Sequence, residues 1–93
     1  MKKNAYVEKA QAQLDELSGK IKVLKAKAQG TQASVKIEYE KRIEELNTLK
    51  EATMKKLEEI KNSTDDAWEK TKIGFEKSVK SIEEKIKSTI SKF

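Results

Sequence analysis

The feature that most constrains the fold is a spacing of eleven residues between large apolar side chains. Eleven residues complete three helical turns at about 3.67 residues per turn, close to the 3.6 of a straight α-helix. Seven successive positions follow this spacing: Leu24, Val35, Leu46, Leu57, Trp68, Val79 and Ile90. The spacing therefore predicts long helices that each carry one narrow, nearly straight apolar stripe.

The composition favours helices and removes most catalytic chemistry. The chain has 93 residues, of which 40% are charged, with three Gly and no Pro, Cys or His. Because β-turns use Gly and Pro, an all-β fold is not expected. Without Cys or His, no thiolate or imidazole can bind a metal, attack a substrate or transfer a proton. We therefore predict an all-α protein with no enzymatic activity, cofactor, metal site or small-molecule substrate.

Two segments contain residues that interrupt helices. Asn62-Ser63-Thr64-Asp65-Asp66 is rich in side chains that bond to nearby backbone groups, and Ser63 is suited to cap a new helix. Gly30 is weaker, because one Gly costs only about 1 kcal/mol in a helix. We predict a single helical unit over 1–93: a long helix over 3–61 with an irregularity near Gly30, a turn at 62–64 and an amphipathic helix over 64–92. The alternative is a three-helix bundle that breaks at Gly30 and Ser63.

The apolar stripe predicts helix-on-helix packing. A narrow stripe stabilises nothing within an isolated helix, so we expect a helical hairpin or coiled coil that forms a homo-oligomer. The predicted packing seam comprises Leu14, Leu17, Ile21, Leu24, Val35, Ile43, Leu46, Leu49, Leu57, Ile60, Trp68, Phe75, Val79, Ile82, Ile86, Ile90 and Phe93.

The segment from Trp68 to Phe93 has a second interpretation. Apart from Ile73, its large apolar residues occupy one side of a helix, and lysines that suit an anionic membrane surface lie away from them. These lysines are Lys70, Lys77, Lys80, Lys87 and Lys92. Trp68 is expected to anchor helix packing or, in the membrane interpretation, to lie at the headgroup level.

The charge gives weaker guidance about partners. The net charge is +5, but the basic residues are 20 Lys and one Arg, and no run exceeds two. Nucleic-acid binding is not expected, because base and phosphate recognition favour Arg. The sequence shows neither a secretory signal nor an apolar stretch of membrane-spanning length, so we expect a cytoplasmic location.

Three stretches resemble the small, uncharacterised bacterial coiled-coil proteins with apolipoprotein-like eleven-residue repeats. They are the central Lys36-Ile-Glu-Tyr-Glu-Lys-Arg-Ile-Glu-Glu-Leu46, Asp66-Ala-Trp68-Glu69 and the terminal Ser91-Lys-Phe93. The resemblance implies an elongated, all-helical protein with no established activity. From the stripe we predict a structural protein acting as scaffold, spacer or filament subunit. The alternative is a peripheral, stress-associated lipid-binding protein.

Overall fold

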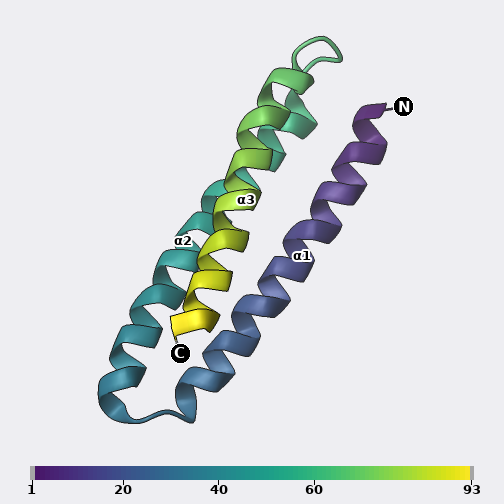
Figure 1. Cartoon of the computed structure of the whole chain (residues 1–93). Helices are drawn as coiled ribbons and strands as arrows, with labels where there is room; N and C mark the ends of the chain where they lie inside the picture. Colours follow the sequence, from purple (N-terminus) through teal and green to yellow (C-terminus); the bar gives the residue numbers. More distant parts are fainter. Residues whose placement is uncertain (1, 93) are drawn as a thin grey trace.

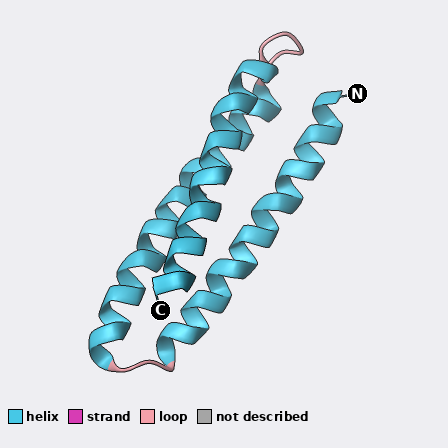
Figure 2. Ribbon diagram, viewed as in Figure 1, coloured by secondary structure: helices cyan, strands magenta, loops and turns pink. Residues whose placement is uncertain are grey.

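Three long helices fold back on one another along a common axis (Figure 1). The computed structural model describes residues 2–92, with α1 at Lys2–Gln29, α2 at Ala33–Asn62 and α3 at Trp68–Lys92. Residues 2–92 contain no strand, and the predicted all-α fold class is confirmed (Figure 2). The bundle measures 51 × 18 × 17 Å, and its radius of gyration is 15.2 Å. A globular chain of this length would have a radius of roughly 12 Å, so the molecule is a rod.

The predicted long helix over 3–61 is interrupted at residues 30–32, which is a correction to that prediction. The backbone N–H of Gly30 bonds the Lys27 carbonyl at 3.1 Å, and the Thr31 hydroxyl donates to the Ala28 carbonyl at 2.8 Å. These bonds give hydrogen-bond partners to two carbonyls at the end of α1, where the helix itself supplies none. Gln32 is extended and accepts the first bond of α2, from the Lys36 N–H at 2.8 Å. The three-helix alternative fits this chain path.

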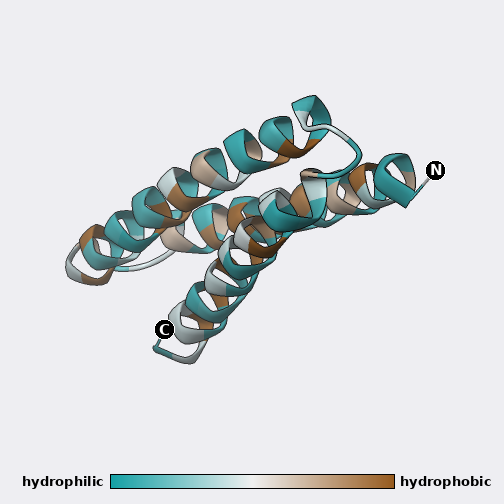
Figure 3. Ribbon diagram, turned by 90° about the horizontal axis from the view of Figure 1, so that it is seen from above, coloured by the Kyte–Doolittle hydropathy of each residue, from teal (hydrophilic) through white to brown (hydrophobic). Residues whose placement is uncertain are grey.

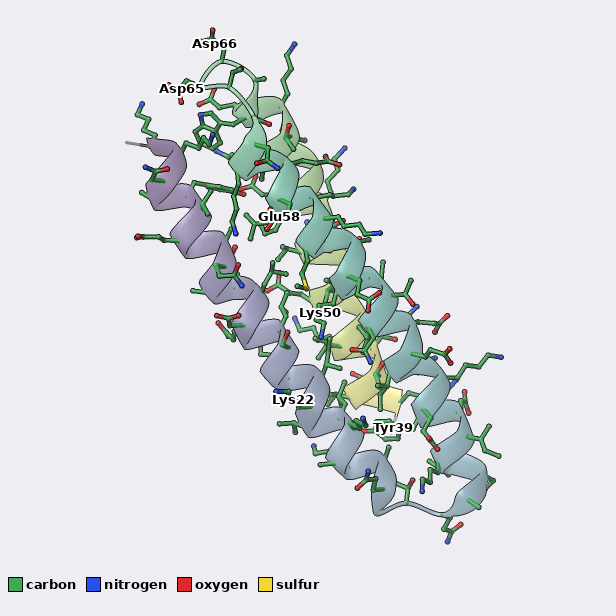
Figure 4. All side chains as sticks on the ribbon, turned by 180° about the vertical axis from the view of Figure 1, so that it is seen from behind. Lys22, Tyr39, Lys50, Glu58, Asp65 and Asp66 are labelled. Carbon is green, nitrogen blue, oxygen red and sulfur yellow. The ribbon has the colours of Figure 1, made fainter. Side chains whose placement is uncertain are left out.

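The second interruption lies where the sequence predicts it but is longer than the predicted turn at 62–64. The Ser63 hydroxyl donates to the Glu59 carbonyl at 2.6 Å, so it closes α2 and does not cap α3. The N–H groups of Ala67 and Trp68 both bond the Thr64 carbonyl, and α3 begins at Trp68 rather than at residue 64. Figure 4 shows Asp65 and Asp66 in this loop. Lys3 on α1 braces the loop by donating to the Ser63 carbonyl at 2.6 Å.

The buried residues follow steps of three and four along each helix, with one full step of seven on α2 and one on α3. On α1 they are Ala10, Leu14, Leu17, Ile21, Leu24 and Ala28. Such steps average 3.5 residues, the period that keeps one face of a helix toward neighbours crossing at a small angle. Figure 3 shows the apolar residues on the helix sides that face one another. A seven-residue repeat, rather than one continuous eleven-residue repeat, therefore organises the core.

Two predicted seam residues lie outside this core. Val35 is 36% exposed because it is in the first turn of α2, at the end of the bundle. Ile90 is 53% exposed, and its neighbour Thr89 is buried in its place. The seven-residue steps on α3 reach position 89, whereas the eleven-residue spacing from Val79 reaches position 90. Phe93 lies outside the described residues.

Candidate interaction surfaces

The remaining predicted seam residues form the core of a single chain. Leu49 is partly buried, and the others are buried: Leu14, Leu17, Ile21, Leu24, Ile43, Leu46, Leu57, Ile60, Trp68, Phe75, Val79, Ile82 and Ile86. Their apolar surface is covered by the other helices of the same chain. Contact with a second molecule must therefore use mainly the residues that stay exposed outside this core.

Two threonines in the core were not predicted from the sequence. Thr53 and Thr89 are fully buried, and each hydroxyl donates to the carbonyl four residues earlier, on Leu49 and Lys85 respectively. Within the described residues, every buried side-chain nitrogen and oxygen has a hydrogen-bond partner. The described core thus offers no unpaired polar group to a substrate.

An aromatic cluster joins α1 to α3 near the 63–67 loop. The Tyr6 ring centroid lies 5.5 Å from that of Trp68 and 6.2 Å from that of Phe75, the latter in an edge-on arrangement. The Lys72 ammonium lies 5.3 Å from the Tyr6 centroid and 5.7 Å from the Trp68 centroid, within cation–π range. Trp68 is only 7% exposed and packs inside the bundle.

Tyr6 is not among the predicted seam residues, because it precedes Leu14, where the predicted apolar stripe begins. Extending that stripe backwards from Leu14 in steps of four gives Ala10 and then Tyr6, which is the signal that locates it. The Tyr6 hydroxyl donates to the Glu76 carboxylate at 3.2 Å. Burial raises the pKa of Tyr6 well above its usual value, and the charge of Glu76 raises it further.

The five lysines predicted to contact an anionic surface lie on a mixed-charge face of α3. Lys92 is half-exposed and forms an ion pair with Glu38 of α2 at 2.7 Å, which lowers the pKa of the Glu38 carboxyl. Lys70, Lys77, Lys80 and Lys87 are exposed, but α3 also contains Glu69, Glu76, Glu83 and Glu84. The apolar stripe of α3 faces the other helices, so it is not available to a membrane in this structure.

The side of the bundle between α1 and α3 is the least closed. Both helices pack mainly along α2 and contact each other less. A groove of about 560 Å³ lies between them, with Leu17, Ile86 and Ile90 as its apolar lining. Its charged lining is Lys20, Lys80, Glu83, Glu84 and Lys87. This groove combines apolar surface with both signs of charge.

Residues 2–92 contain neither a metal-type cluster of side chains nor a helix of membrane-spanning character. This part of the chain contains no group of three or more carboxylates placed to hold a metal ion. None of its helices combines the length and apolar character needed to cross a membrane. No family model, curated protein or solved structure matches the chain.

Proposed function

We propose that this protein is a non-enzymatic structural protein, a coiled-coil rod that self-associates and serves as a scaffold or spacer. The observation that carries the proposal is the groove between α1 and α3. It leaves Ile90 half-exposed among the charged residues that line the groove, next to the buried Ile86. A second copy that covers this groove would remove the exposed apolar surface from water.

The charges around the groove suit pairing between identical surfaces. In a two-fold dimer both copies use the same surface patch, so the groove of one copy lies against the groove of the other. Lys80 and Lys87 of one copy can then lie opposite Glu83 and Glu84 of the other, because both signs line the groove. The rod shape supports a spacer role, since α1 begins near one end of the bundle and α3 ends toward the other (Figure 1).

Sedimentation velocity of the full chain over a range of concentrations tests the proposal. The wild type is expected to form a dimer, and Ile90→Lys is expected to be monomeric because it places a charge in the apolar part of the groove. Ile37→Lys is the matched control, since Ile37 is 70% exposed on α2 and does not line this groove. A wild type that stays monomeric, or an equal loss of dimer in both variants, contradicts the proposal. Circular dichroism checks that both variants remain helical.

A further inference from the structure

One stretch of the chain differs from the rest in charge. Residues 17–37 contain Lys20, Lys22, Lys25, Lys27 and Lys36 and no acidic residue. Elsewhere basic and acidic residues are interspersed, and α3 has seven Lys and four Glu. The acid-free stretch occupies the second half of α1 and the start of α2, so its positive charge collects toward one end of the rod.

The positive charge on α1 is largely uncompensated. Lys22, Lys25 and Lys27 are exposed and form no ion pair with any described residue, whereas Lys20 lies 3.7 Å from Glu16. Of these lysines, Lys25 lines a groove together with Glu40 and Glu44 of α2. Lys22 is labelled on this part of α1 in Figure 4. Three ammonium groups are thus free to meet an anionic partner.

An aliphatic side chain lies in the middle of these lysines. Val23 is 55% exposed, and the exposed neighbours Gly19 and Ala26 add no charge. At 3.6 residues per turn, Lys20 and Lys27 lie on one side of Val23 and Lys22 lies on the other. Lys25 lies on nearly the opposite side of α1, where it lines a groove with α2. Long lysine side chains beside an apolar centre suit a membrane interface, where the stems lie along the acyl boundary and the ammonium groups reach the headgroups.

We propose that this face of α1, defined by Lys20, Lys22, Val23 and Lys27, docks on an anionic phospholipid bilayer. Charge complementarity selects the partner, because each lysine near an anionic bilayer adds to its attraction. Val23 favours lipid over nucleic acid, since an aliphatic side chain gains nothing from a phosphate backbone, and the stretch has no Arg for bidentate phosphate contacts. The three helices stay folded in this contact, which distinguishes it from insertion of an opened α3.

Vesicle co-sedimentation of the full chain tests the contact. The vesicles are phosphatidylcholine with about a quarter phosphatidylserine, compared with phosphatidylcholine alone, at about 0.1 M salt. We expect binding to the mixed vesicles alone. The triple variant Lys20→Gln, Lys22→Gln and Lys27→Gln should bind on the order of a hundredfold more weakly. Val23→Ser should weaken binding severalfold, while Ile37→Ser on the outer face of α2 should not.

A matched triple variant separates local contact from net charge. Lys70→Gln, Lys77→Gln and Lys80→Gln remove the same charge from α3 and should change binding less than about threefold. An equal loss in both triple variants, or equal affinity for duplex DNA at the same salt, overturns the proposal. The contact goes beyond the proposed scaffold role and shares only Lys20 with the groove between α1 and α3. Ile90→Lys should therefore keep its vesicle binding whether or not the wild type dimerises.

Discussion

The Tyr6 hydroxyl on α1 and the Glu76 carboxylate on α3 lie 3.2 Å apart, although seventy positions separate them in the sequence. This hydrogen bond requires a neutral phenol, because a phenolate has no proton to donate and would repel the carboxylate. The ionisation of one side chain is therefore coupled to the packing of α1 against α3.

The first prediction concerns alkaline pH. Because the pKa of Tyr6 is raised in the folded state, the folded protein holds this proton after the unfolded chain has lost it. The contribution is complete below the ordinary tyrosine pKa of 10.0 and decreases as the pH rises above that value. The urea midpoint of the wild type should therefore fall above about pH 10 more steeply than that of Tyr6→Phe. Parallel curves for the two proteins would contradict the coupling.

The second prediction compares two apolar residues on α2. Leu46 is fully buried, so Leu46→Ala should lower the free energy of unfolding by about 2–5 kcal/mol through lost burial and a residual cavity. Ile37→Ala, at an exposed position, should change the free energy by no more than about 0.5 kcal/mol. Urea unfolding measures both. Similar losses in the two variants would show that Ile37 is covered in solution.

The third prediction concerns the buried threonine of α2. The Thr53 hydroxyl donates to the Leu49 carbonyl. In an α-helix the same carbonyl also accepts a hydrogen bond from a backbone N–H, so it keeps a partner without the hydroxyl. Thr53→Val leaves no orphaned acceptor, so stability should be unchanged or higher by up to about 1 kcal/mol. Thr48→Val is the control, because Thr48 makes the same kind of bond to Glu44 but is exposed. A loss above about 1 kcal/mol for Thr53→Val alone would assign its hydroxyl a larger structural role.

The fourth prediction addresses the loop between α1 and α2. Gly30 does not have a positive φ, and an added Cβ would meet only the Lys27 carbonyl at an ordinary 3.7 Å. Gly30→Ala should therefore raise stability by about 0.4–1 kcal/mol by restricting the unfolded chain. Small-angle X-ray scattering should show the same radius of gyration for Gly30→Ala as for the wild type. A marked increase would mean that alanine joins α1 and α2 into one helix and that the bundle has opened.

The helices and most of the core could be predicted from the sequence, because the apolar stripe is visible in the spacing. The interruption at Gly30 could not be decided in the same way. The same stripe can be buried in two ways: one long helix can pack against other chains, or the chain can fold back on itself. Tertiary packing decides between these two arrangements. The prediction that Val35 and Ile90 belong to the packing seam is wrong for a related reason. A spacing of eleven equals one step of seven plus one of four, so the two repeats coincide at Leu46, Leu57, Trp68 and Val79. They diverge near the start of α2 and the end of α3, where Val35 and Ile90 lie.

The acid-free stretch over residues 17–37 is visible in the sequence, but the net charge of the whole chain does not reveal it. Counting charge over residues 1–30 includes Glu8, Asp15 and Glu16 and hides the acid-free stretch. The ion pairs across helices, such as Lys85 with Glu45 at 3.3 Å, had no signal in the sequence because they depend on how α3 lies against α2.

An odd number of helices has a mechanical consequence. Because α1 begins near one end of the bundle and α3 ends toward the other, a pull on Lys2 and Lys92 acts along the rod (Figure 1). Such a pull slides the helices past one another, so many core contacts bear the load at once. A two-helix hairpin, with both ends on the same side, would instead be peeled apart one layer at a time.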